Sequence, residues 1–202
     1  MMATTHALAG IAIAAVLSVV SPEASVLTVV AAGAGGLFPD LDLYAGHRKT
    51  LHFPVYFSAG AVGAVALALL DPTALTLGAA VFLLAALHSV MDAFGGGLEL
   101  RPWLGTSDRA VFSHYHDRWI EPRRWIRYDG APEDLTLAGF LSAPALVTLE
   151  PPLTYGVLAL VGVSAVYVLL RKPMVAIAER LVAAMPDPVR GRIPERFVED
   201  LH

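Results

Sequence analysis

Six apolar stretches, each followed by a helix-breaking sequence, divide the chain. They cover residues 4–20, 24–38, 53–70, 73–91, 135–149 and 153–170. The breakers include Pro39, the glycine run 95–97 and the pair Lys172-Pro173, all residue types that end helices. No strand-like alternation of polar and apolar residues accompanies the stretches, so they predict helices. A membrane-spanning helix needs about 20 apolar residues. The third, fourth and sixth stretches meet this length, the first is borderline, and the second and fifth are short.

The composition agrees with a membrane protein. Hydrophobic residues make up 56% of the chain and charged residues 16%, with a mean hydropathy of +0.61, whereas soluble domains carry roughly 25% charged residues. The chain has no cysteine, which excludes disulfides and thiolate metal ligands. Acidic residues outnumber basic ones, 18 to 14, so the composition does not predict nucleic-acid binding.

The connections between the stretches differ in length and charge. Short turns lie near Ser21, Asp71 and Pro151, whereas residues 39–52 and 92–134 form long polar links. Six antiparallel helices place both long links and both termini on one side, and all 14 Lys and Arg residues fall there. Positive residues mark the cytoplasmic side of membrane proteins. We therefore expect an all-α, polytopic transmembrane bundle of about six helices in the plasma membrane, surrounded by lipid, with both termini cytoplasmic.

The chain divides into one main domain and a tail. Residues 1–172 form the predicted transmembrane domain, which includes a cytoplasmic loop at 93–134. Residues 173–202 form a tail with an amphipathic stretch from Met174 to Met185, which is typical of a helix that lies on a membrane surface. A solvated tail helix without function is an equal alternative.

The same topology brings candidate metal ligands to one membrane surface. The predicted cytoplasmic helix ends and the first long link carry seven imidazole and carboxylate side chains: His6, Asp40, Asp42, His47, His52, His88 and Asp92. Such side chains are the usual ligands of zinc and related ions. Ionisable groups in membrane helices are costly and usually face a functional interior. We expect one or two divalent ions, with zinc favoured, at this surface.

The motifs in this group also have ordinary structural interpretations. His88 and Asp92 are four residues apart, so one helix face presents both to an ion. The alternative is that they cap the helix and pair with arginine. Asp40 and Asp42 can bind an ion or orient a histidine ligand, or they can form a polar turn.

Three neighbouring residues are expected to act on a substrate. Arg48 suits a phosphate or a carboxylate because its guanidinium presents a planar fork of donors. Asp42 can act as a base or orient a metal ligand, and His47 places an imidazole next to Arg48. An ordinary basic loop beside the membrane is the alternative.

A second histidine cluster lies in residues 113–118, which read Ser-His-Tyr-His-Asp-Arg. His114 and His116 can complete a second metal site or supply acid–base chemistry. Because Trp119 and Trp125 lie nearby, an interfacial belt of aromatic and basic residues is an equal alternative.

Five motifs follow one another within residues 1–105. They are Thr5-His6-Ala7-Leu8-Ala9-Gly10, Pro39-Asp40-Leu41-Asp42, the stretch from His47 to His52, the helix end His88 to Asp92, and the segment from Gly95 to Trp103. In order and spacing they resemble the membrane-bound metal-dependent hydrolases, also called LexA-binding inner membrane-associated hydrolases. Two departures from that family's pattern are the displaced Thr50 and the presence of Phe53 in place of a serine. The resemblance implies a membrane-bound, metal-dependent hydrolase.

The ligand order is more distantly similar to that of zinc-dependent phospholipase C and related nucleases, in which several zinc ions hydrolyse phosphate esters. Residue by residue, that similarity implies the ligand set His6, Asp40, His52, His88 and Asp92. Those enzymes add a later histidine and a His-x-x-x-Glu pair. Here the later region supplies His114 and His116 without that pair.

These observations predict an integral membrane hydrolase that uses a metal-activated water to cleave a phosphoester such as a lipid headgroup. The preference for an amphiphilic phosphoester follows from the location and the resemblance. One alternative is a non-enzymatic membrane protein with a structural or sensing metal site that docks a cytosolic partner. Another is a soluble all-helical hydrolase in which the apolar stretches form a buried core.

Overall fold

The computed structural model describes residues 1–20, 26–70 and 77–186. Within these residues, six α-helices of at least 12 residues account for the six apolar stretches: α1 (Ala3–Val20), α2 (Val26–Leu37), α4 (Pro54–Leu70), α5 (Leu77–Phe94), α6 (Pro132–Thr148) and α7 (Leu153–Ala184). The predicted all-α class is confirmed. Pro132 lies in the first turn of α6, where the missing proline N–H has no helical partner to lose.

Short elements fill the two long links. The first link contains the 3-10 helix η1 (Phe38–Asp42) and the single turn α3 (Leu43–Gly46), and the second contains the 3-10 helix η3 (Pro102–Leu104). The second link also forms an antiparallel hairpin of β1 (Val111–Ser113) and β2 (Arg118–Ile120). The sequence did not predict this hairpin, because strands of three residues are too short to show an alternating pattern.

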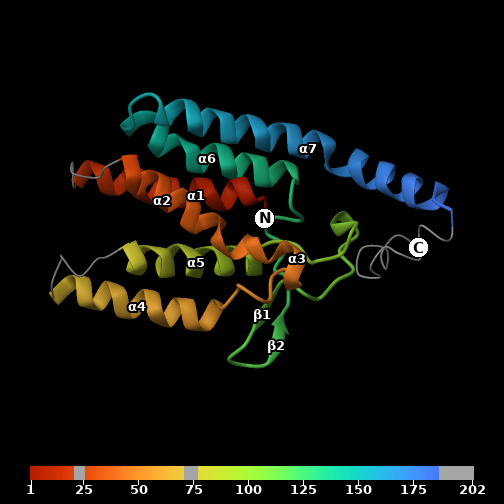
Figure 1. The fold of residues 1–202 in the computed structure, drawn as a ribbon, viewed down its shortest axis with the longest axis horizontal. Coiled ribbons are helices and arrows are strands. Elements are labelled where there is room, and N and C mark those ends of the chain that lie inside the picture. Colours follow the sequence, from red (N-terminus) through yellow and green to blue (C-terminus); the bar gives the residue numbers. More distant parts are fainter. Residues whose placement is uncertain (21–25, 71–76, 187–202) are drawn as a thin grey trace.

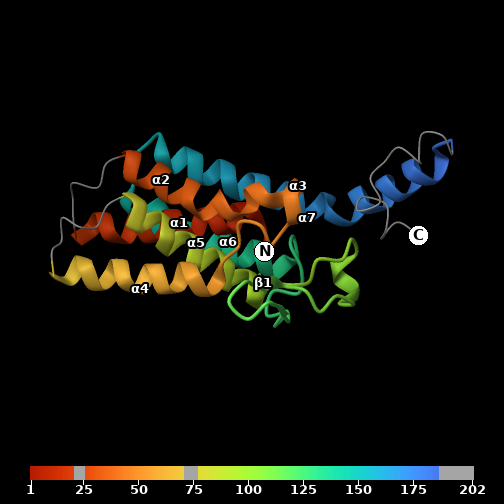
Figure 2. The same cartoon turned by 60° about the horizontal axis from the view of Figure 1, so that its bottom comes forward.

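The long helices lie side by side in a row. Contacts join α4 to α5, α5 to α2, α2 to α1, α1 to α6, and α6 to α7, and the same arrangement is visible in Figure 1. The N-terminus, α3 and the hairpin lie beside the same ends of the helices (Figures 1 and 2). The two long links therefore meet at one end of the helices, as the topology predicted. The C-terminal end of the chain, residues 187–202, lies outside the described residues.

Glycines allow α1 and α2 to approach each other closely. A Cβ atom on Gly10 would lie 2.2 Å from the carbonyl oxygen of Ala32, and one on Gly36 would lie 2.3 Å from that of His6. Neither distance is sterically allowed, so these positions require glycine. The contact fixes the N-terminal turn of α1, and with it His6, against the end of α2.

Two helical segments are long and apolar enough to cross a membrane. They are Val26–Gly46, which joins α2 to α3, and Leu153–Ala184. The apolar parts of α1, α4 and α5 are shorter and cover Ala3–Val19, Pro54–Leu67 and Phe82–Phe94. At 1.5 Å per residue, fewer than about 18 residues fall short of a hydrocarbon core about 30 Å thick. The described residues thus contain two candidate spans, and the expectation of six spans is not supported.

Helix α7 is longer than predicted. It continues through Pro173 to Ala184, so the expected break at Lys172-Pro173 is wrong and the amphipathic stretch from Met174 belongs to the same helix. The second half of α7 extends beyond the other helices (Figure 2). It contacts the second long link through an ion pair between Arg101 Nε and Glu179 Oε1 at 2.7 Å.

Candidate metal centre

Four of the predicted ligands come together at the end of the helices where the two long links meet. Asp40 comes from η1, His52 from the residue pair before α4, and His88 and Asp92 from the last turns of α5. One ligand atom from each lies within 4.8 Å of the other three. His52, His88 and Asp92 are at most 1% exposed, whereas the side chain of Asp40 is 20% exposed. We refer to these residues as the four-ligand group.

The separations within the group match those of a metal site. His88 Nε2 lies 3.1 Å from His52 Nε2, 3.3 Å from Asp92 Oδ2 and 3.4 Å from Asp40 Oδ1. His52 Nε2 lies 3.3 Å from the same Asp92 oxygen. Metal–ligand bonds of about 2.0–2.2 Å in a tetrahedral zinc site place neighbouring ligand atoms roughly 3.3–3.6 Å apart. Four of the six separations are therefore close to the edges of such a tetrahedron.

Both imidazoles are oriented through Nδ1. His88 Nδ1 lies 2.6 Å from the carbonyl oxygen of Gly36, and His52 Nδ1 lies 3.0 Å from Asp42 Oδ2. A carbonyl oxygen only accepts, so Nδ1 of His88 donates the proton, and the carboxylate favours the same tautomer in His52. Each neutral ring then directs its Nε2 lone pair into the group, as in metal-bound histidines. Asp92 Oδ2, buried beside them, has no hydrogen-bond partner among the described residues.

A cation can interact with all of these acceptor atoms at once. Protons compete with it for the same lone pairs. Burial lowers the pKa of His52, but the hydrogen bond with Asp42 and the nearby charge of Asp92 outweigh burial and raise the pKa above its ordinary value. A proton on Nε2 and a metal ion occupy the same lone pair, so metal binding releases protons. The geometry and the donor set thus fit a divalent ion.

Asp42 organises the loop that carries His52. Its Oδ1 atom lies 3.2 Å from His47 Nδ1 and accepts the backbone N–H of Arg48 at 3.2 Å. Its Oδ2 atom accepts the backbone N–H of Leu51 at 3.0 Å and contacts His52 Nδ1. With both oxygens engaged, Asp42 is better placed to orient a ligand than to act as a base.

Arg48 lies between the four-ligand group and the second long link. It is 4% exposed, and its Nη1 atom donates to the carbonyl oxygens of Gly96 and Ala110 at 2.7 and 3.4 Å. Its Nη2 atom lies 3.4 Å from Asp92 Oδ1, while Nε has no partner among the described residues. The backbone φ of Arg48 is 58°, in the left-handed region that non-glycine residues rarely adopt. A hydrogen bond from Phe112 N to the Arg48 carbonyl at 2.9 Å holds this conformation.

His6 is adjacent to the four-ligand group but not part of it. Its ring stacks on that of His88, with 3.6 Å between centroids. Its Nε2 atom lies 3.2 Å from Asp92 Oδ1, the oxygen that also pairs with the Met1 ammonium at 2.8 Å. His6 therefore contacts the Asp92 oxygen that faces away from the other ligands.

His114 and His116 do not join the other candidate ligands. His114 Nε2 lies 2.7 Å from the carbonyl oxygen of Lys49, and its ring stacks on Phe53 at 4.5 Å. His116 Nδ1 lies 2.9 Å from Ser113 Oγ. The structure therefore does not bring them together with the four-ligand group, because the hairpin directs both rings to other partners.

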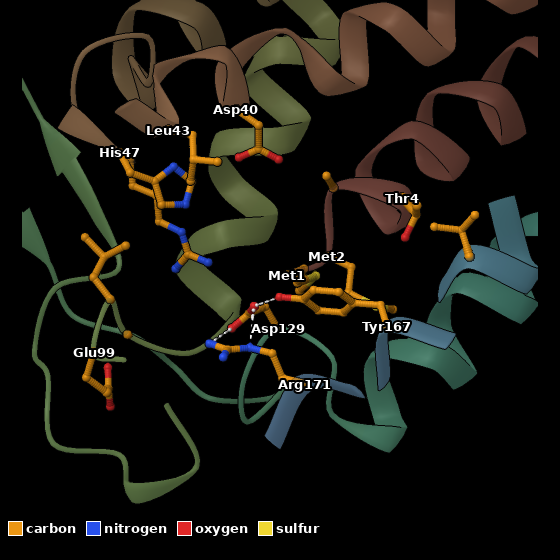
Figure 3. Close-up of a pocket in the computed structure, with 15 residues that line it drawn as sticks. Met1, Met2, Thr4, Asp40, Leu43, His47, Glu99, Asp129, Tyr167 and Arg171 are labelled. Atoms are coloured by element: carbon orange, nitrogen blue, oxygen red, sulfur yellow. Dashed lines mark hydrogen bonds and ion pairs between the residues drawn. The ribbon is translucent and has the colours of Figure 1, made fainter. Parts of the chain in front are cut away.

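A cavity of about 650 Å³ adjoins the four-ligand group. Its polar lining includes Asp40, His47, Arg48, Asp129, Tyr167 and Arg171. Asp129 accepts hydrogen bonds from Tyr167 Oη and, at 3.0 Å, from Arg171 Nε. Figure 3 shows these three residues across the cavity from Asp40 and His47, and we call them the polar cluster. Sequence reasoning missed it, because Asp129 and Arg171 are 42 residues apart and only Arg171, at the end of an apolar stretch, gives a signal.

The metal centre is identified from its ligand atoms and not from similarity to known proteins. Comparison with protein-family models, with curated proteins and with solved structures finds no match for this chain. Two imidazole nitrogens and two carboxylate oxygens suit zinc and other divalent first-row ions. A group formed by Asp40, His52, His88 and Asp92 could thus hold a metal ion.

Proposed function

We propose that the protein is a membrane-embedded, metal-dependent hydrolase of the kind its motifs resemble, with zinc bound by Asp40, His52, His88 and Asp92. The observation that supports this most strongly is the convergence of four buried or half-buried acceptor atoms within 4.8 Å of one another, with four of their six separations at 3.1–3.4 Å. Uncompensated acceptors are costly in a buried site. A divalent ion held there supplies Lewis-acid activation of water and of a phosphoryl oxygen.

The surrounding side chains suit a phosphoester substrate. Arg48 lines the cavity, and its Nη2 atom lies 3.4 Å from the ligand Asp92, so its guanidinium charge suits a phosphate oxygen beside the metal ligands. Asp42 holds His52 in its ligating tautomer. His47 also lines the cavity and its side chain is 27% exposed, which allows its imidazole to exchange a proton with substrate or solvent.

The surface of the helix row supports a membrane location. No Asp, Glu, Lys or Arg occurs in residues 3–20, 26–37, 54–70, 77–91, 135–149 or 153–170. Leu69, Phe140, Val147 and Leu169 are each more than 70% exposed, although water disfavours such large apolar surfaces. The basic residues concentrate in the long links near the centre and in α7 beyond Leu170, which favours a cytoplasmic site.

A structural or sensing metal site that docks a cytosolic partner is the second candidate. It is favoured by the burial of His52, His88 and Asp92, since structural zinc sites are closed. Against it stands the cavity, which reaches Asp40 and leaves one side of the group accessible. Because four protein ligands complete a tetrahedron, a catalytic zinc here would have to take water as a fifth ligand on the side open to the cavity, which a purely structural site does not need.

Metal analysis of the purified protein tests the assignment. We expect stoichiometric zinc in the wild type, loss of zinc in His88→Ala and Asp92→Ala, and retention in His116→Ala. Stoichiometric zinc in both His88→Ala and Asp92→Ala would refute the ligand set.

An activity assay tests whether the protein is an enzyme. Hydrolysis of p-nitrophenyl phosphate and bis(p-nitrophenyl) phosphate that a chelator abolishes supports the hydrolase. Bound zinc without hydrolysis of any phosphoester favours the structural or sensing site.

A further inference from the structure

The cavity is much larger than a phosphate group requires. At about 650 Å³ it falls in the range of small-molecule pockets, about 300–1,000 Å³. Asp40 of the four-ligand group lines one part of the cavity. Val163, Tyr167 and Arg171 of α7 line another part. A substrate that occupies it has a sizeable organic part in addition to its phosphate.

One end of the cavity suits an anion. Arg48 lines this end beside Asp40, and it is 4% exposed. The only carboxylate paired with Arg48 among the described residues is Asp92, and Asp92 also belongs to the four-ligand group. Once Asp92 serves a metal ion, the positive charge of Arg48 is available to a phosphate.

The opposite end suits a neutral oxygen. Arg171 is paired with Asp129 through Nε at 3.0 Å and Nη2 at 3.3 Å, so the pair is close to neutral. The side chain of Arg171 is 13% exposed, and no hydrogen bond among the described residues uses its Nη1 atom. A fixed, charge-neutralised guanidinium recognises a carbonyl oxygen without requiring a second negative charge.

Much of the remaining lining is apolar. Met2, Leu43, Leu98 and Val163 contribute to the lining. Val163 and Leu43 are 57% and 54% exposed, so this apolar lining continues onto the outer surface of the molecule. An alkyl chain can run along it from the cavity into surrounding lipid.

We propose that the cavity binds an acylated phosphoester, with the phosphate at Arg48, an ester carbonyl at Arg171 and the alkyl chain against Val163. This inference rests on the proposed function, because it assigns the four-ligand group to the phosphate end. It adds Arg171 and Val163 as specificity-determining residues, with Asp129 and Tyr167 as positioning residues for Arg171.

Two pairs of matched variants test the proposal on the zinc-loaded full chain in neutral detergent, with binding measured by titration calorimetry. The probe is 1-octanoyl-glycerol 3-phosphate. Val163→Trp fills the cavity, whereas Val166→Trp makes the same change at a valine on α7 that is also over half exposed but lies outside the lining. We expect Val163→Trp to weaken binding about tenfold and Val166→Trp to leave it unchanged. Equal weakening of probe binding in the two variants would overturn the proposal. Partitioning of the probe into detergent micelles affects both variants alike, so it cannot produce a difference between them.

The second pair tests recognition of the ester. Arg171→Met is compared with Lys172→Met, whose residue does not line the cavity. We expect Arg171→Met to weaken binding of the acyl glycerophosphate about tenfold while binding of octyl phosphate, which lacks the carbonyl, stays unchanged. An equal loss for both probes would remove Arg171 from ester recognition, and equal affinity of octyl phosphate and inorganic phosphate would exclude the alkyl site.

The outcomes separate this inference from the hydrolase itself. If the zinc-loaded protein binds the probe with the expected variant pattern but hydrolyses no phosphoester, the hydrolase proposal fails and the binding site stands. If the protein hydrolyses small phosphoesters but Val163→Trp and Arg171→Met behave like their controls, the hydrolase stands and this inference fails.

Discussion

The Nε2 atoms of His52 and His88 face each other at 3.1 Å, and each ring is held by a hydrogen bond at its Nδ1 atom. The two rings come from different elements, the loop before α4 and the last turns of α5. Without a cation, this arrangement brings two acceptor lone pairs together. The two Nδ1 partners, Asp42 and the Gly36 carbonyl, therefore fix the orientation of both rings.

Replacing Asp42 by Asn tests the role of the carboxylate behind His52. Asn keeps the shape of the side chain but removes the charge that favours the Nδ1–H tautomer of His52. We expect zinc affinity to fall about 10–100-fold, the usual cost of losing such a partner, as measured by chelator competition. His116→Ala serves as the control because His116 contacts Ser113 rather than the ligands. Unchanged zinc affinity in Asp42→Asn would show that Asp42 does not orient His52.

The raised pKa of His52 predicts a pH-dependent response to zinc. Its protonated form stabilises the metal-free fold below the unfolded pKa of about 6.5, and this stabilisation is lost as pH rises through the raised folded pKa. Zinc needs Nε2 unprotonated. The increase in Tm caused by zinc should therefore grow as pH rises from about 6.5 through the raised folded pKa of His52. Thermal unfolding with excess zinc or with chelator measures it, and a zinc effect that shrinks over this interval would contradict the assignment.

Much of the fold and the site follows from the sequence because the ligands lie at helix ends. The lengths of the apolar runs determine where each helix ends, and the order of short and long links places those ends together. His88 and Asp92 also share a helix face by their spacing. These local rules placed seven candidate ligands at one surface, and Asp40, His52, His88 and Asp92 are the four of them that come together.

Features that depend on tertiary contacts could not be predicted in this way. His114 has the same ligand chemistry as His52, but the hairpin directs its ring to the Lys49 carbonyl. Helix α7 continues through Pro173, although the sequence there resembles a helix end. Nothing in the spacing of Asp129 and Arg171 indicates that they line one cavity.

The backbone of Arg48 predicts an unusual stability pattern. Its φ of 58° costs a non-glycine residue about 1 kcal/mol or more, while glycine adopts it freely. We expect Arg48→Gly to be more stable than Arg48→Ala by about 1 kcal/mol in denaturant unfolding. Both variants should lose phosphoesterase activity, because both lack the guanidinium. Equal stability of the two variants would show that the loop relaxes out of the left-handed conformation.

Gly36 links the packing of the helices to the metal centre. It leaves space for the backbone of His6, and its carbonyl oxygen accepts a hydrogen bond from His88. A Cβ atom there would lie 2.3 Å from the His6 carbonyl oxygen, and the Gly36 carbonyl oxygen accepts the hydrogen bond from His88 Nδ1. Gly36→Ala should therefore separate α1 from α2, lower Tm and reduce zinc affinity in the same variant.

Gly63 of α4 provides the matched control for this substitution. A Cβ atom added there meets no atom within 4 Å, so Gly63→Ala should leave zinc affinity unchanged. It should also raise stability by up to about 1 kcal/mol, because alanine favours the helix more than glycine does. Thermal unfolding and zinc titration of both variants give the comparison. A Gly36→Ala protein with wild-type Tm and zinc affinity would mean that the α1–α2 contact does not support the centre.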